Sequence, residues 1–195
     1  MDPFRNDTSL FAQLRWLNRY YYLRAFVSVV WVAAAFALGT RNTTIAGTLL
    51  VIYPAWDALA NYLDALRSGG ITKNKTQAIN FAVSVATTIA VLQTLQLSMH
   101  AVLGVYGAWA ILSGLLQLGT AVKRRKRYGA QWAMMLSGGQ SALAGGFFIV
   151  QALQPAMPSI ANVAGYAAVG AIYFLISALW LTVSRMRGRA AASEA

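Results

Sequence analysis

The stretch Met99–Arg127, with the sequence MHAVLGVYGAWAILSGLLQLGTAVKRRKR, decides the fold of this chain. Its first 24 residues, up to Val122, contain no Asp, Glu, Lys or Arg. About 20 predominantly apolar residues are enough for a helix to cross the hydrocarbon core of a bilayer. Five consecutive cations, Lys123–Arg127, follow directly. Because such clusters stay on the cytoplasmic side of a membrane, this stretch predicts a transmembrane helix and also its direction.

Five further apolar stretches of similar length indicate that the chain crosses the membrane repeatedly. They are Tyr21–Leu38, Thr44–Leu63, Ala78–Leu97, Ala130–Leu153 and Val163–Val183. Hydrophobic residues make up 58% of the 195 residues and charged residues only 11%, whereas soluble domains have about 25% charged residues. The segments between the stretches are too short to fold alone. We therefore predict one all-α domain, a polytopic membrane protein with six transmembrane helices.

The positive charges predict which side of the membrane each connection occupies. Fifteen of the sixteen Lys and Arg residues fall on one side once the chain is divided at these stretches, and Arg41 is the exception. An even number of spans with both termini in the cytoplasm satisfies the positive-inside rule for every connection. This topology accounts for the net charge of +11, so we do not expect nucleic acid as a partner. The basic clusters are Arg5, Arg15 and Arg19; Arg67, Lys73 and Lys75; Lys123–Arg127; and Arg185, Arg187 and Arg189.

The same division gives three segments along the chain. Residues 1–20 are expected to form a cytoplasmic or interfacial segment, either a helix lying on the membrane or an extension of the first transmembrane helix. Residues 21–183 form the transmembrane domain, and residues 184–195 form a basic cytoplasmic tail.

Short internal matches suggest that the spans are three copies of a helical hairpin. The sequence YPAW at Tyr53–Trp56 recurs as YGAW at Tyr106–Trp109 and, more weakly, as YAAV at Tyr166–Val169. In the odd-numbered spans, VSV at Val27–Val29 recurs at Val83–Val85. Matches at a fixed period are typical of repeat architectures. We therefore predict three similar hairpins that all point the same way, rather than the inverted repeats of many secondary transporters.

The chain resembles the HdeD-like family of small bacterial membrane proteins. The resemblance rests on the six spans, the three similar hairpins, the even-numbered helices that are rich in Gly and contain Trp, and the basic inner connections. Gly47–Trp56 and Gly104–Gly119 carry the resemblance best. It implies a location in the bacterial inner membrane and a role in acid or general stress resistance, and it supplies no catalytic residues. Pro54 and Asp57 have no counterparts in the other two repeats, which argues against a simple mechanism based on the repeat.

Asp57 is the most informative candidate for a functional site. It lies well inside the second span, where an acidic side chain costs about 2.5–3.5 kcal/mol on insertion scales. Asn61 and Asp64 follow on the same helical face. Arg24 lies a few residues inside the antiparallel first span, so we predict that Arg24 and Asp57 reach similar depth and pair. Two interpretations remain open: these four residues are part of a proton or ion path, or the pair only joins two helices.

Other polar residues offer little support for a relay across the whole membrane. In spans three, five and six we singled out only Gln93, Gln96, Ser137 and Gln140. None of these four side chains is ionisable, and this weakens a pump mechanism.

Pro54 and the small residues predict features of helix geometry. Proline removes one backbone hydrogen bond, so we expect Pro54 to kink the second span and to free a carbonyl group near Leu50. Residues such as Gly138, Ala142 and Gly146 are spaced four apart in span five, a pattern that lets helices approach closely. The spacing alone does not show whether these residues pack within one chain or between subunits.

His100 and the run Lys123, Arg124, Arg125, Lys126 and Arg127 suggest contacts at the two membrane surfaces. Histidine changes charge in the range of pH 5 to 8, so His100 is a candidate for a response to external acid; the alternative is an ordinary surface residue. A dense basic run attracts anionic lipid, although topology alone also explains these five residues.

The residue inventory does not favour catalysis. With one His and no Cys, neither a catalytic triad nor a metal cluster can be assembled, so we expect no enzyme, no metal and no cofactor. The leading hypothesis is a non-catalytic inner-membrane protein. The alternatives are a small transporter or channel that uses Asp57, Asn61 and Arg24, and an accessory subunit of a larger membrane complex. Expected partners are membrane lipids and either a second copy of the chain or another membrane protein.

Overall fold

A computed structural model describes residues 3–126 and 130–193, with side chains described for residues 12–126 and 130–187. Within these ranges the regular structure is entirely helical. Six helices are long and apolar enough to cross a membrane, which confirms the predicted all-α, six-span architecture. The elements are α1 (Pro3–Ala34), η1 (Ala35–Gly39), α2 (Thr43–Arg67), α3 (Lys75–Thr94), α4 (Met99–Arg124), α5 (Gln131–Ala152) and α6 (Ile160–Ser193).

The first and last helices extend beyond the apolar spans. Helix α1 begins at Pro3 and continues without a break past residue 20, and α6 continues past residue 183 to Ser193. Leu17 and Tyr20 of α1 are buried against Phe174, Ala178 and Leu181 of α6. The described part of the N-terminal segment therefore extends the first transmembrane helix.

Local sequence explains where the middle helices begin and how they turn. The side chain of Asn42 accepts a hydrogen bond from the backbone N–H of Ile45 at 3.0 Å, and Ser98 does the same for Ala101 at 3.1 Å. Such caps satisfy amide groups that have no partner inside the helix. After α2, Gly69 and Gly70 have φ angles of 107° and 95°, which favour glycine.

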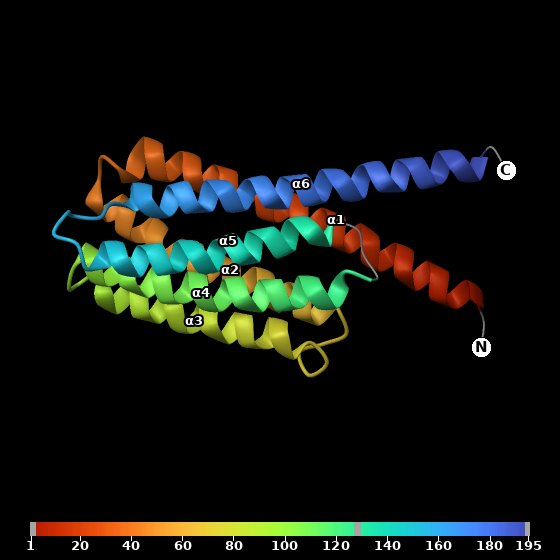
Figure 1. Cartoon of the computed structure of the whole chain (residues 1–195), viewed down its shortest axis with the longest axis horizontal. Helices are drawn as coiled ribbons and strands as arrows, with labels where there is room; N and C mark the ends of the chain where they lie inside the picture. Colours follow the sequence, from red (N-terminus) through yellow and green to blue (C-terminus); the bar gives the residue numbers. More distant parts are fainter. Residues whose placement is uncertain (1–2, 127–129, 194–195) are drawn as a thin grey trace.

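All connections that we predicted to be cytoplasmic lie at one end of the bundle (Figure 1). The ends of the chain, the segment after α2, the end of α4 and the start of α5 lie there, and we call this the basic end. The connections after η1, α3 and α5 lie at the opposite, distal end. The arrangement agrees with an even number of spans.

The helices close into a ring. Each helix contacts the next one along the chain, and α6 returns to contact α1. The closest packing within the ring occurs between hairpins, where α2 packs on α3, α4 on α5 and α6 on α1. The even-numbered helix of each hairpin therefore packs on the odd-numbered helix of the next, as expected for three similar hairpins that point the same way.

Glycines bring α4 and α5 into backbone contact. A Cβ atom added to Gly114 would lie 2.7 Å from the carbonyl oxygen of Gly138, and one added to Gly145 would lie 2.5 Å from that of Gly107. Gly146 has no atom within 4 Å of an added Cβ. The close contacts are therefore seven residues apart on each helix, and not four apart as the sequence pattern suggested. They lie within the chain.

The buried apolar residues form two clusters, one toward each end. The basic-end cluster includes Leu17, Tyr21, Met134, Phe174 and Leu181. The distal cluster is larger and rich in aromatic residues, and it includes Trp31, Leu50, Leu103, Tyr106, Trp109 and Phe148. The buried polar side chains described next extend from the middle of these helices to the basic end.

Candidate functional site

Arg24 of α1 and Asp57 of α2 form a buried ion pair between Arg24 Nη2 and Asp57 Oδ1. Their side chains are only 13% and 9% exposed. The predicted pairing of these residues is therefore present, and the antiparallel first two helices bring them to the same depth. A buried charge needs a partner and further hydrogen bonds to offset the loss of hydration.

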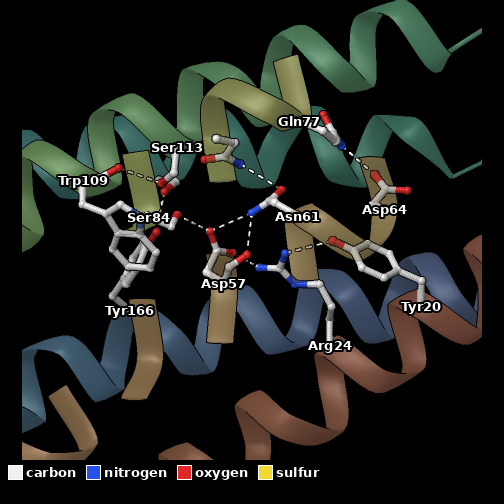
Figure 2. Close-up of polar contacts among 12 residues, drawn as sticks. Tyr20, Arg24, Asp57, Asn61, Asp64, Gln77, Ser84, Trp109, Ser113 and Tyr166 are labelled. Carbon is white, nitrogen blue, oxygen red and sulfur yellow. Dashed lines mark hydrogen bonds and ion pairs between the residues drawn. The ribbon is translucent and has the colours of Figure 1, made fainter. Parts of the chain in front are cut away.

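Those further bonds come from the same two helices and from α3 and α4 (Figure 2). Asn61 Nδ2 and Ser84 Oγ each donate to Asp57 Oδ2 at 2.8 Å. Trp109 Nε1 donates to Ser84 Oγ at 3.0 Å, and Arg24 Nη1 donates to the hydroxyl oxygen of Tyr20 at 3.1 Å. Asn61 of α2 and Ser84 of α3 therefore hold the carboxylate of Asp57, and Trp109 of α4 holds Ser84.

A second ion pair lies one to two helical turns nearer the basic end. Arg124 Nη2 of α4 lies 2.8 Å from Asp64 Oδ2, and the side chains are 14% and 1% exposed. Gln77 Nε2 also donates to Asp64 Oδ2, at 2.6 Å, and Ser68 Oγ donates to Oδ1 at 3.1 Å. Thr120 Oγ1 in turn donates to Gln77 Oε1 of the side-chain amide at 3.0 Å.

Neutral amides extend the network of the first ion pair toward the second, and both sets of residues line one cavity. Asn80 Nδ2 of α3 donates to Asn61 Oδ1 at 3.1 Å, and Asn61 in turn donates to Asp57. Ser84, Asn80 and Gln77 lie on one face of α3, at helical spacing. We define the polar column by its members Arg24, Asp57, Asn61, Asp64, Gln77, Asn80, Ser84 and Arg124.

Two cavities of about 40 Å³ each lie along the column. The one toward the basic end is lined by residues of both ion pairs, and the other extends to Tyr53, Ser137, Gln140 and Tyr166. Arg24 and Asn80 line both cavities, and Arg24 Nε and Asn80 Oδ1 have no hydrogen-bond partner among the described residues. Polar cavities need about 10–15 Å³ for a water molecule, so each has room for about three.

A larger cavity of about 330 Å³ lies where the column reaches the basic end. Asp64 and Arg124 line it together with residues of α1, α2 and the segment that precedes α3. The polar column therefore leads into a wider space at this end. We call this space the basic vestibule; its lining is Gln13, Trp16, Leu17, Asp64, Arg67, Ser68, Asn74, Lys123 and Arg124.

Toward the distal end the column stops at packed aromatic rings. The ring of Tyr53 lies 4.5 Å from that of Trp31 and 5.8 Å from that of Trp109, between centroids. Trp109 also packs edge-on against Tyr106 at 5.6 Å. Because these side chains belong to or pack against the distal apolar cluster, that cluster separates the column from the distal surface.

The carbonyl group that Pro54 was predicted to free near Leu50 has a partner from another helix. Without an N–H group at Pro54, the carbonyl group of Leu50 loses its helical donor. The hydroxyl group of Tyr106 supplies one, at 2.6 Å from the Leu50 oxygen. Tyr106 belongs to the second repeat, so a residue of the second hairpin supplies the hydrogen bond that Pro54 removes in the first.

A serine–tyrosine contact marks two of the three repeats. The side chains of Ser28 and Tyr53 are hydrogen-bonded, and the hydroxyl oxygens of Ser141 and Tyr166 lie 2.5 Å apart. In the second repeat Ser84 instead bonds Asp57 and Trp109. Asp57, which has no counterpart in the other repeats, thus bonds Ser84 of the neighbouring hairpin.

The remaining predicted site residues divide between the two ends. His100 Nε2 lies 3.0 Å from the carbonyl oxygen of Gln154 and 3.2 Å from that of Ala156, so it joins α4 to the connection between α5 and α6. Among the described residues, no group of three or more His, Cys, Asp or Glu side chains could hold a metal ion.

The basic run Lys123–Arg127 begins in the last turn of α4, and its first two members bond other side chains of the protein. Arg124 departs from the predicted lipid contact, because its guanidinium group is turned inward to Asp64 and Ser68. Lys123 bonds the hydroxyl group of Thr76 at 3.1 Å. Arg125 and Lys126 are exposed, and Arg127 lies outside the described residues.

The contribution of α3 was not predicted from the sequence. Gln93 and Gln96, the two polar residues noted in this span, are exposed at the distal end, whereas a different, polar face of the chain's third spanning segment is buried. The helical spacing of these polar residues in an otherwise apolar span could have predicted a polar face. Its members are Gln77, Asn80, Ser84 and Thr87.

Comparison with known proteins gives one family match. A protein-family profile described as "Short repeat of unknown function (DUF308)" matches residues 82–150. The matched segment runs from α3 through α4 and into α5, and its description agrees with the internal repeats. Neither the curated proteins nor the solved structures gave a match to this chain.

Proposed function

We propose that this chain is a non-catalytic protein of the bacterial inner membrane, similar to HdeD-like proteins, that supports survival under acid or general stress. Three observations support the proposal. The chain has six membrane-spanning helices, residues 82–150 match the DUF308 repeat, and this repeat occurs in the HdeD-like family. Asp57 in the buried polar column has no counterpart in the other two repeats.

Survival of a deletion strain tests this proposal. We expect deletion of the gene to lower survival after an acid challenge and the wild-type gene to restore it. Asp57→Asn should restore less, because it removes the charge that Arg24 needs, whereas Gln96→Ala at the exposed distal end should restore fully. Survival of the deletion strain equal to that of the parent under acid and other stresses would contradict the proposal.

A second candidate function is a path for protons or water-sized solutes. The observation that favours it is the pair of polar cavities along the column, which continue from the basic vestibule to the aromatic residues near the middle of the bundle. With volumes of about 40 Å³, these cavities accommodate water but no larger solute. Passage of protons or water across the whole membrane would require the distal apolar cluster to open.

Flux through purified protein in liposomes tests this second function. We expect a pH gradient to collapse faster in liposomes with protein than in empty ones, and Asp57→Asn to slow the collapse without loss of helical content. Gln96→Ala is the matched control and should behave like wild type. Proton flux indistinguishable from that of empty liposomes would remove this candidate.

A further inference from the structure

The basic vestibule has the size and the lining of a ligand site. Its volume of about 330 Å³ falls at the lower end of the range for small-molecule sites. The residues that form it come from α1, α2, the segment before α3, and α4. Because it lies where the spanning parts of α2 and α4 end, it is at the depth of the lipid headgroups.

The charges that line the vestibule are unequal. Arg67, Lys123 and Arg124 are cationic, and Asp64 is the only described acidic side chain in the lining. Arg124 and Asp64 compensate each other through their ion pair. Arg67 and Lys123 form no ion pair with a described residue, so the lining carries two uncompensated positive charges.

Both uncompensated cations keep donors available. The guanidinium group of Arg67 lies over the ring of Trp16, 5.2 Å from its centroid, which holds it at the wall of the vestibule. It donates no hydrogen bond to a described residue. Lys123 uses one of its three N–H groups on Thr76. Trp16 also lines the vestibule, and its indole N–H is buried without an acceptor among the described residues.

We propose that the basic vestibule binds a phosphate group through Arg67 and Lys123. A planar guanidinium group and an ammonium group in the lining of one cavity suit the several oxygen atoms and the negative charge of a phosphate. Basic pockets between transmembrane helices on the cytoplasmic side are known to hold anionic headgroups. The phosphate belongs either to an anionic lipid or to a soluble phosphate compound. This inference does not depend on the proposed function.

The test uses the full-length protein purified in a mild, uncharged detergent. In one arm, native mass spectrometry measures retention of added phosphatidylglycerol against phosphatidylcholine, which has the same phosphate but no net charge. In the other arm, calorimetry measures binding of inorganic phosphate. We expect the wild type to bind at least one of the two anionic probes in preference to its control, which is chloride in the second arm. Binding of the lipid alone identifies a headgroup, and binding of inorganic phosphate identifies a soluble source.

Two double variants that remove the same charge distinguish a defined binding site from general electrostatic attraction of anions to the basic end. Arg67→Gln with Lys123→Gln should weaken binding about tenfold or more, since each cation near a membrane surface contributes substantially to anion binding. Arg15→Gln with Lys73→Gln removes the same charge from exposed residues that do not line the vestibule, and should leave affinity within about threefold of wild type.

Either of two results would overturn the proposal. The first is a wild-type protein that binds neither anionic probe in preference to its control, and this result needs no variant. The second is equal loss of binding in the two double variants, which would mean that the cations attract anions only through their summed charge.

Discussion

At the scale of single residues, Asp57 organises the interior of the bundle. It accepts from Arg24, Asn61 and Ser84, so residues of three helices depend on one carboxylate. Removing one partner of a buried ion pair leaves an uncompensated charge, which costs about 3–5 kcal/mol in proteins where it has been measured. The cost of replacing the whole pair is much smaller, because no charge is then left alone.

This asymmetry predicts the result of a charge exchange. Arg24→Asp and Asp57→Arg should each lower the free energy of unfolding by about 3–5 kcal/mol and reduce the amount of protein in the membrane. The double variant should recover part of both losses, since the exchanged charges can pair again. Thermal unfolding in detergent and membrane yield measure this; a double variant no better than the worse single variant would contradict the pairing.

The sequence allowed prediction of this pair but not of its surroundings. Arg24 and Asp57 stood out because charged residues are rare in spans and because antiparallel helices place them at similar depth. Ser84 and Trp109 did not, because a hydroxyl group or an indole in an apolar helix is compatible with a structural position. Arg124 was misassigned for a different reason: within a run of five cations, the sequence does not show which one turns inward.

At the scale of elements, α2 depends on a neighbouring helix at its proline. Helix α4 supplies the hydroxyl group of Tyr106 to the carbonyl group of Leu50, which Pro54 leaves without a helical donor. The proline and its consequence were predictable from the sequence. The donor was not, because it comes from a residue 56 positions away.

A double-mutant cycle tests this relation. Tyr106→Phe should lower the free energy of unfolding by about 1 kcal/mol, because the Leu50 carbonyl group loses its donor. In a Pro54→Ala background the same change should cost close to nothing, because the restored N–H group can bond Leu50. Denaturation of the four proteins in one detergent gives the coupling energy. Equal costs in the two backgrounds would show that the hydroxyl group does not serve the proline break.

The interface of α4 and α5 gives a second prediction for elements. Gly145→Leu would force a side chain into the Gly107 backbone, so we expect a loss of about 1–3 kcal/mol or more. Gly146→Leu is the control at the adjacent position, where an added Cβ has no neighbour within 4 Å, and it should be tolerated. Equal stability of the two variants in thermal unfolding would contradict the glycine packing.

At the scale of the whole molecule, sequence and structure agree on the number of spans and on their alternation. The apolar stretches predicted each span, and the positive charges predicted that both termini lie at one end of the bundle, where Figure 1 places them. The closure of the ring, with α6 packed on α1, was not predictable. It depends on side-chain packing between the first and last helices, which no local pattern specifies.

The ring gives the molecule two unlike ends. At the basic end, the vestibule leads to the two ion pairs; at the distal end, aromatic residues are packed between the helices. Each functional proposal above requires the basic end to face the cytoplasm.

Labelling of single cysteines tests that orientation most directly, because the natural chain contains no cysteine. A membrane-impermeant thiol reagent is added to intact spheroplasts and, separately, to inverted membrane vesicles that carry Arg41→Cys or Lys126→Cys. We predict that Arg41→Cys reacts only in spheroplasts and Lys126→Cys only in inverted vesicles. Reaction of both positions from the same side, or of Lys126→Cys in intact spheroplasts, would contradict the topology and the functional proposals that depend on it.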